Sequence, residues 1–231
     1  MTYVLHYAPD NASLIIRLAL EHRGLAYRTQ LVDRKADAQR SAGYLALNPN
    51  GLIPVLETPQ GPLFETGAIL LWLADKHGGL GPAPDAVTRG DFLKWLFFAS
   101  NTLHSAERML FYPDKYIAAN AAQTLRTGLR TQLARSFATL ETVADTRPAW
   151  LGAKDPTVLD FYVAALLRWP MLYPADEARG WLSLSTFPAL GRLCAHLETL
   201  PCTLALQKAE GLGKTPFTDP QYPTPPEGSA T

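Results

Sequence analysis

The chain is poor in cysteine and has no long hydrophobic run. Cysteine occurs only twice among its 231 residues, at Cys194 and Cys202. Their spacing matches neither a Cys-x-x-Cys redox pair nor a set of zinc ligands, so we interpret both as buried small hydrophobic residues. The apolar stretch around residues 69–73 is much shorter than the roughly 18 to 20 residues that span a bilayer. We therefore expect no metal site and no membrane span.

An excess of charge of either sign is also missing. Lys and Arg together number 21, as do Asp and Glu, so the formal net charge is zero. Non-specific binding to nucleic acid or to an anionic membrane normally needs a strong positive excess, and we expect neither partner. Residues 1–7 lack the basic start and long apolar run of a secretory signal, which favours a cytoplasmic protein.

The composition that is present is typical of a folded protein. Hydrophobic residues make up 47% of the chain and charged residues 18%, which excludes the charge-rich, weakly hydrophobic composition of disordered proteins. A chain of this length forms one large domain or two modest ones.

The first third of the chain alternates between strand and helix patterns. Residues 3–7 and 27–32 are β-prone, residues 13–23 and 38–47 have helical spacing, residues 53–56 and 62–64 flank a turn, and residues 68–76 form a third apolar helix. Ser13 is a candidate cap for the first helix, and Gly24 is suited to end it. The predicted element order is βαβαββα.

A Gly/Pro-rich stretch at residues 78–84 separates this region from a helical one that runs to about Gly211. Within it, Thr157 and Asp160 have the spacing of a capping box. We predict an α/β domain over residues 1–80, an all-helical domain over residues 88–213, and a Pro-rich extended tail over residues 214–231.

Two motifs connect the chain to a known family. The sequences NPNGLIPVL (residues 48–56) and FETGAI (residues 64–69) resemble the glutathione S-transferase superfamily, whose members combine a thioredoxin-like domain with a helical bundle. Bacterial beta-class enzymes are the most similar class, on the evidence of LH at 103–104, TVLD at 157–160, LRW at 167–169 and AEGL at 209–212. The resemblance covers roughly residues 3–213.

The resemblance implies a glutathione site on the first domain. The family's proline at position 54 is cis, which would turn the Ile53 peptide outward to pair with the cysteinyl backbone of glutathione. Thr66, at the start of a helix, and Glu65 would hold the γ-glutamyl end. Pro54 alone could be a loop proline and Thr66 alone a helix cap, but their combination at this spacing favours binding.

A transferase of this kind must lower the pKa of the glutathione thiol. A thiol titrates near 8.5, so ionisation near pH 7 needs a drop of about two pH units, or about 2.7 kcal/mol. One charge-assisted hydrogen bond supplies roughly 1.5 to 3 kcal/mol, and a helix N-terminus adds up to about 1 kcal/mol. We expect the donor to lie between Pro9 and Ser13.

The resemblance places Ala12 where the beta class carries its active-site cysteine, so the usual thiol is absent. The remaining donors are Ser13, then Asn11, and more weakly Tyr7, which could equally be a packing residue. Ser13 could instead serve only as the helix cap.

The helical domain would complete the site. Asn101 and His104 match a beta-class segment that approaches the bound thiol, and their i, i+3 spacing puts them on one face of an α-helix. The class has a basic residue directly after this histidine; Ser105 stands there, and Arg108 is a possible substitute. Candidates for the apolar electrophile site are Tyr7, Phe111, Tyr112, Tyr116 and Trp169.

The primary prediction is therefore a glutathione transferase that directs the thiolate to an apolar electrophile. Glutathione is a co-substrate, and no metal or bound cofactor is implied. Ether cleavage and the reduction of peroxides or disulfides start from the same thiolate and stay open. A non-catalytic binding or interaction protein is the alternative from another class, motivated by Ala12 and the tail. The family also implies a homodimer through the third helix and the opening helices of the second domain.

Overall fold

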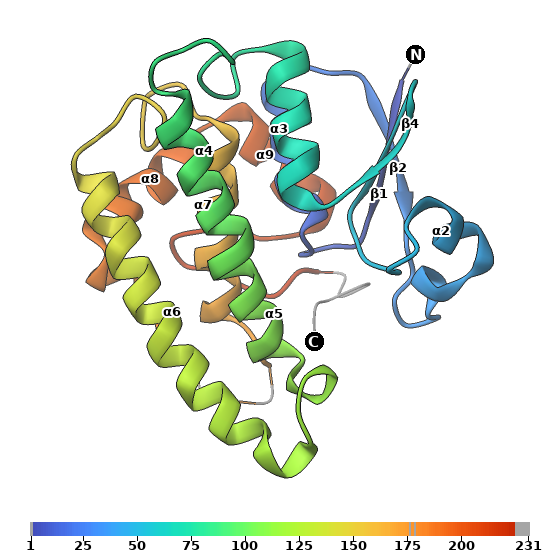
Figure 1. Cartoon of the computed structure of the whole chain (residues 1–231), viewed down its shortest axis with the longest axis vertical. Helices are drawn as coiled ribbons and strands as arrows, with labels where there is room; N and C mark the ends of the chain where they lie inside the picture. The colour runs from blue at the N-terminus through green and yellow to red at the C-terminus, as the bar shows by residue number, and fades with distance from the viewer. Residues whose placement is uncertain (1, 176, 178, 225–231) are drawn as a thin grey trace.

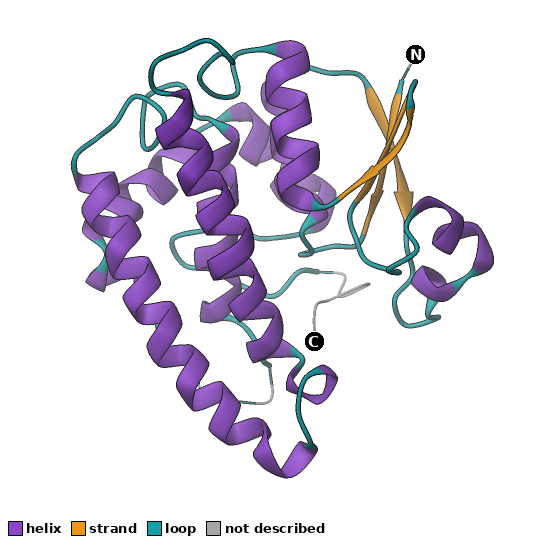
Figure 2. Ribbon diagram, in the orientation of Figure 1, coloured by secondary structure: helices purple, strands orange, loops and turns teal. Residues whose placement is uncertain are grey.

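The computed structural model describes residues 2–175, 177 and 179–224. A small twisted sheet with its helices lies beside a larger helical bundle (Figures 1 and 2). The N-terminal domain contains β1 (Tyr3–Tyr7), α1 (Ser13–His22), β2 (Tyr27–Leu31), α2 (Ala42–Leu47), β3 (Val55–Thr58), β4 (Gly61–Phe64) and α3 (Thr66–His77). This confirms the predicted βαβαββα order.

The sheet has the strand order β2-β1-β3-β4. β1 pairs with β2 in parallel, whereas β3 is antiparallel to both β1 and β4. The β1–β2 pair needs a crossover connection, which α1 supplies, and β3 and β4 need only the tight turn that the sequence predicted. α1 ends as expected, since Gly24 has a positive φ of 60° just after the helix. The second helix is shorter than predicted: a 3₁₀ turn at Ala38–Arg40 precedes α2.

The second domain is helical, as predicted. Its elements are α4 (Arg89–Phe98), the π-helical segment Ala99–His104, α5 (Ser105–Phe111), α6 (Ala122–Asp145), α7 (Val158–Arg168), α8 (Pro188–Glu198) and α9 (Pro201–Glu210). Every residue of α7 is buried, so this helix forms the centre of the bundle. α1 packs against α7 and α9, which joins the two domains through one apolar core. No helix within the described ranges is long and apolar enough to cross a membrane.

The start of α7 confirms the predicted capping box. The Thr157 hydroxyl accepts a hydrogen bond from the Leu159 N–H at 3.2 Å, and Asp160 Oδ2 accepts one from the Thr157 N–H at 2.7 Å. Asp160 also accepts the Gly152 N–H at 2.6 Å. The cap therefore satisfies the first amides of a helix that has no access to water.

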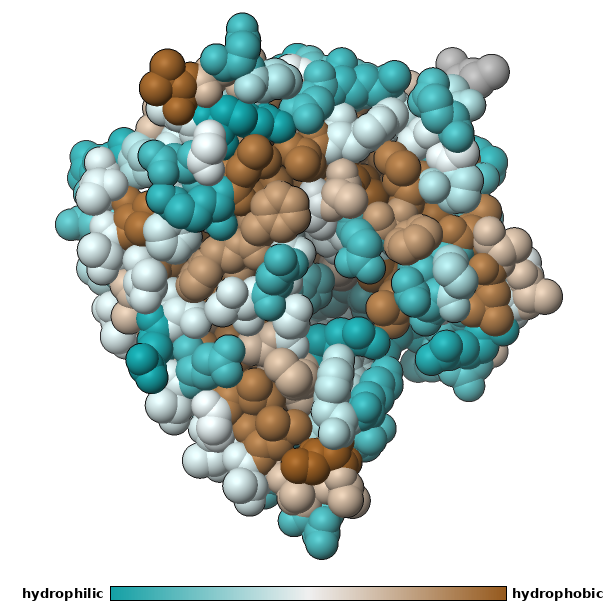
Figure 3. Space-filling view, in the orientation of Figure 1, coloured by the Kyte–Doolittle hydropathy of each residue, from teal (hydrophilic) through white to brown (hydrophobic). Residues whose placement is uncertain are grey.

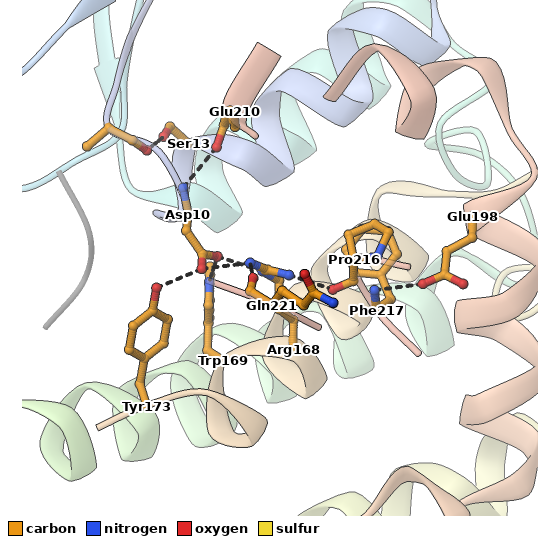
Figure 4. Close-up of polar contacts among 11 residues, drawn as sticks. Asp10, Ser13, Arg168, Trp169, Tyr173, Glu198, Glu210, Pro216, Phe217 and Gln221 are labelled. Atoms are coloured by element: carbon orange, nitrogen blue, oxygen red, sulfur yellow. Dashed lines mark hydrogen bonds and ion pairs between the residues drawn. The ribbon is translucent and has the colours of Figure 1, made fainter. Parts of the chain in front are cut away.

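The described part of the C-terminal tail is docked on the bundle. Residues 214–224 contain no regular helix or strand, but Phe217 is completely buried. Glu198 accepts the backbone N–H groups of Phe217 and Thr218, both at 2.8 Å, and Arg168 donates to the carbonyl oxygens of Pro216 and Gln221 (Figure 4). This segment therefore belongs to the second domain rather than extending from it. The rest of the predicted tail, residues 225–231, lies outside the described residues.

Candidate functional site

A cavity of about 260 Å³ lies between the two domains. The first domain lines it with the loop before α1, the turn before β3 and the start of α3, and the second domain with the π-helical segment, α5 and α7. Several segments that are distant in the sequence therefore meet at one place, which is the usual setting of a small-molecule site.

The turn before β3 forms one wall of the cavity. The Ile53–Pro54 bond is cis, as expected, and both residues line the cavity. The paired part of β3 begins at Val55, so the Ile53 peptide lies outside the ladder. The turn is held from behind, since the Tyr44 hydroxyl and the Asn48 amide both donate to the Leu52 carbonyl at 2.8 Å.

The start of α3 forms the adjoining wall. Glu65 has φ 70° and ψ 114°, a backbone conformation that costs a non-glycine residue roughly 1 to 3 kcal/mol and is concentrated at functional sites. Thr66 is the first residue of the helix and lines the cavity together with Glu65. The unpaired N–H groups of a helix start and its positive dipole end favour an anion here.

The structure contradicts the geometry expected of Ser13. Ser13 is fully buried, its hydroxyl donates to the Ala8 carbonyl at 3.2 Å, and it is not part of the cavity wall. It is also not the cap of α1, because the N-cap position is Ala12, which makes no side-chain cap bond. The hydroxyl turns back toward the loop, so it satisfies a buried carbonyl and does not face a ligand.

Asn11 and Ala12 do line the cavity at the start of α1. At the position expected to hold a cysteine, the wall therefore presents a methyl group. Asn11 supplies an amide beside it, at the end of the α1 dipole that favours negative charge. Of the three donors that the sequence proposed, the cavity wall contains only Asn11, since Tyr7 packs instead under the guanidinium of Arg17, 4.7 Å from its ring centroid.

Asp10, which precedes these residues, is held by the second domain (Figure 4). Its carboxylate accepts hydrogen bonds from Arg168, from the Trp169 indole N–H at 3.0 Å and from the Tyr173 hydroxyl at 2.8 Å. Its backbone N–H donates to Glu210 at 3.0 Å. Asp10 has a positive φ of 53°, a conformation uncommon for a residue with a side chain. This network fixes the backbone that leads into Asn11 and Ala12.

The π-helical segment changes which polar residues face the cavity. Ser100, His104 and Ser105 line it, whereas Asn101 is exposed to solvent and is absent from the wall. A π-helix closes i→i+5 hydrogen bonds, so residues three apart no longer share a face as they do in an α-helix. The expected pairing of Asn101 with His104 on one face is therefore wrong. Ser100, rather than Asn101, lines the cavity together with His104.

His104 is held by a tyrosine that the sequence analysis did not identify. Its Nδ1 atom lies 2.8 Å from the hydroxyl of Tyr162, which also lines the cavity. Burial, together with the positive charge of Arg108, lowers the pKa of His104 to about 4, so the ring is neutral near pH 7. Burial raises the pKa of Tyr162 and outweighs the opposite effect of Ser100 and Thr66. If the phenol donates to Nδ1, the remaining ring proton is on Nε2.

Tyr162 could have been found from the sequence only by a weak signal. It is a polar aromatic within the apolar run that follows the capping box at Thr157, a pattern that otherwise indicates core. Its role becomes visible when α7 is placed beside the π-helical segment.

Only some of the residues expected at the electrophile site line the cavity. Phe111, Tyr112 and Trp169 line the cavity. Tyr7 and Tyr116 do not, and Tyr116 lies largely exposed beside Arg108. The wall also contains Arg34, Arg40, Arg108 and Lys115, of which only Arg108 was considered in the sequence.

Comparison with known proteins gives consistent matches. A family model described as the N-terminal domain of glutathione S-transferase matches residues 12–76. A glutathione S-transferase of Xanthomonas campestris is 31% identical over 215 residues, covering 90% of this chain and 98% of that protein.

Two solved structures extend these matches. A sphingomonad glutathione S-transferase complexed with glutathione is 27% identical with a TM-score of 0.74, covering 91% of this chain and 100% of the other. A beta-class glutathione S-transferase of Sphingomonas chungbukensis is 26% identical with a TM-score of 0.73, covering 89% and 98% of the two chains.

Proposed function

Because this chain belongs to the glutathione S-transferase family, with likeness to the bacterial beta class, we propose that it binds glutathione in the cavity between its domains and transfers the thiolate to an electrophile. The activity that the family implies is that of a transferase with glutathione as co-substrate. The observation that carries the proposal is the meeting of the Ile53–Pro54 turn, the start of α3 at Thr66 and the start of α1 on one cavity.

Each part of glutathione has a matching wall. The γ-glutamyl carboxylate is placed at the N-terminus of α3, where Thr66 offers a hydroxyl and the helix offers free amides. The cysteinyl backbone lies beside Ile53, whose peptide is outside the β3 ladder. This arrangement directs the sulfur toward Asn11 and Ala12.

The thiolate is stabilised by neutral donors. In this proposal the Tyr162 hydroxyl donates to His104 Nδ1, the Nε2–H of His104 donates to the sulfur, and Asn11 offers an amide at the start of α1. A hydrogen bond to a charged acceptor contributes about 1.5 to 3 kcal/mol, and the helix field adds up to about 1 kcal/mol, which together meet the requirement of roughly 2.7 kcal/mol. The thiol proton leaves to solvent, and the sulfur then attacks the electrophilic carbon.

Titration of the bound thiol tests this function. We would measure ultraviolet difference absorbance of glutathione on the protein across pH, with calorimetry to confirm occupancy. A thiol pKa about two pH units below the free value is expected. Thr66→Ala should weaken glutathione binding, whereas Thr131→Ala, on the exposed face of α6, should not. The proposed site would be contradicted if Thr66→Ala bound glutathione as tightly as the parent protein. It would also be contradicted if the parent protein did not bind glutathione.

A non-catalytic role is the second candidate, and Ala12 is the observation that favours it. The wall has no thiol where the beta class has its cysteine, so a mixed disulfide with the protein cannot form there. Glutathione binding without a shift of the thiol pKa, together with no turnover of any electrophile, would support this candidate. Reduction of peroxides or disulfides by glutathione itself, and ether cleavage, use the same thiolate and are distinguished by substrate.

We also propose a homodimer through α3 and α4. Apolar side chains gather over these helices on the face shown in Figure 3. Phe97 on α4 is 52% exposed, and Trp72 on α3 and Trp95 on α4 are only partly buried. Apolar groups concentrated on one face are typical of an interface between protein chains.

A further inference from the structure

The cavity wall carries a concentration of positive charge that the overall composition does not suggest. Four cations line it, namely Arg34, Arg40, Arg108 and Lys115. The wall contains two carboxylates, and Asp10 is already neutralised by Arg168. Glu65 lies at the start of α3, at the γ-glutamyl end proposed above. The net charge of the chain is zero, so this local excess is a property of the fold.

Glutathione accounts for one of these cations. Arg40 lies against the turn before β3, since its guanidinium NH1 is 3.1 Å from the position that a Cβ on Gly51 would occupy. That turn is the wall assigned to the cysteinyl backbone of glutathione. Glycine follows cysteine in the tripeptide, so we assign its carboxylate to an ion pair with Arg40. In this arrangement the glycine carboxylate is assigned to Arg40, and glutathione supplies no further anion for Arg108 and Lys115, although the Arg40 charge also acts on Lys115.

Two of the cations, Arg34 and Lys115, contact Tyr112. Arg34 NH2 donates to the Tyr112 hydroxyl at 3.0 Å, and Lys115 Nζ lies 4.3 Å from the ring centroid. Burial, followed by the positive charges of Arg108 and Arg34, lowers the pKa of Lys115, and the opposing effect of Asp114 is smaller. The charges therefore act on one another. Like charges gathered on a cavity wall repel, and an anion placed among them removes that repulsion.

Apolar side chains line the cavity together with these cations. Phe111 and Trp169 are nearly buried and line the cavity with Tyr112. Within the described residues, neither Arg108 nor Lys115 belongs to an ion pair. The second-substrate region is thus an aromatic surface bordered by cations, rather than the wholly apolar one that the sequence predicted.

We propose that the electrophile is an anion, with an aromatic or other apolar body on Phe111, Tyr112 and Trp169 and a carboxylate-type group held by Arg108 and Lys115. This inference rests on the proposed transferase function. In the reaction the thiolate sulfur forms a bond to the electrophilic carbon, and the leaving group departs from that carbon with the bonding electron pair. No oxidant or reductant is required.

A pair of electrophiles that differ in charge tests the inference. We would compare 4-chloro-3,5-dinitrobenzoate with the corresponding amide, both of which lose chloride to glutathione, and measure kcat/KM relative to each uncatalysed rate. The parent protein should favour the benzoate by about tenfold or more, the discrimination expected of a charge-assisted hydrogen bond. Added salt should lower this preference.

Variants assign the preference to particular residues. Arg108→Gln and Lys115→Gln should each reduce the ratio of benzoate to amide kcat/KM by about tenfold. Lys208→Gln, an exposed position on α9 outside the cavity wall, removes the same charge and should leave the ratio unchanged. Arg40→Gln should raise KM for glutathione with both electrophiles alike.

The outcomes separate this inference from the proposed function. Equal use of the benzoate and the amide, with no change of ratio in either variant, would overturn the anionic electrophile and leave the transferase intact. If glutathione does not bind, the proposed function fails, and binding of the two compounds to the protein is then measured by tryptophan fluorescence. Tighter binding of the benzoate that is lost in Lys115→Gln would still support the anion site, and equal binding would refute it.

Discussion

Arg168 holds both carboxylate oxygens of Asp10, a residue 158 positions earlier in the chain. Its Nε donates to Oδ1 at 2.7 Å and its NH2 donates to Oδ2 at 2.9 Å, and neither side chain is exposed (Figure 4). The same guanidinium donates to the carbonyl oxygens of Pro216 and Gln221. One buried side chain of α7 thus ties the loop before α1 to the C-terminal segment.

Removing this guanidinium should be strongly destabilising. Arg168→Met leaves the Asp10 carboxylate buried without its cation, which we expect to lower the free energy of unfolding by about 3 to 5 kcal/mol. Urea unfolding followed by tryptophan fluorescence measures it. Arg192→Met, which breaks the exposed pair with Asp145, should cost no more than about 1 kcal/mol. Similar losses in the two variants would contradict a special role for Arg168.

His104 should affect the thiol without titrating near neutral pH. The pKa of His104 is lowered to about 4, so activity should rise with pH along the single ionisation of bound glutathione, and the imidazole should add no second limb near neutral pH. His104→Ala should raise the bound-thiol pKa by about one to two pH units. His104→Gln, which offers an amide donor close to the position of Nε2, should recover part of the shift. An unchanged thiol pKa in His104→Ala would exclude contact with the sulfur.

Glu107 should make the protein less stable as the pH rises. It is completely buried, neither carboxylate oxygen has a hydrogen-bond partner among the residues that the structure describes, and burial raises its pKa well above 4.5. Its stabilising contribution as a neutral acid is present in full below the unfolded pKa. It is lost as the pH rises from there through the folded pKa, because the unfolded chain releases the proton first.

Glu107→Gln should therefore flatten the dependence of stability on pH above about pH 4.5, removing a slope of at most about 1.4 kcal/mol per pH unit. Urea unfolding at pH 5 and pH 8 measures the difference between variant and parent. Asp91→Asn, at an exposed position on α4, is the control. A parallel change in the parent and Glu107→Gln curves would show that this carboxyl does not titrate abnormally.

The surface over α3 and α4 should control the association of two chains. Phe97→Asp places a charge at an exposed apolar position of this surface, and we expect monomers at micromolar concentration in sedimentation velocity. Leu204→Asp changes an apolar side chain of similar exposure on α9 and should leave the dimer intact. A monomeric parent protein would refute the proposed dimer directly.

Most elements of the first domain could be predicted because their signals are local. The alternation at residues 27–31 and the positive φ of Gly24 depend on neighbours a few positions away, as does the capping box at Thr157 in the second domain. Thr66 and the cis Ile53–Pro54 bond came with the motifs that carried the family resemblance.

The errors arose where a side chain's direction depends on a distant partner or on helix geometry. Ser13 turns toward the Ala8 carbonyl, and Asn101 faces solvent because the helix widens into a π turn, a change that residue spacing did not indicate. Phe217 is buried although its surroundings are rich in proline, since Glu198 supplies acceptors for the amides of that segment.

The sequence by itself determined the element order, the motifs that carry the family resemblance and the absence of a thiol at Ala12. Tertiary structure decided which polar groups line the cavity, the support of His104 by Tyr162, and the contacts of Arg34 and Lys115 with Tyr112. The physical reason is range: helix periodicity and capping act over a few residues, whereas burial, pKa shifts and the potential in a cavity depend on every charge that folding brings near.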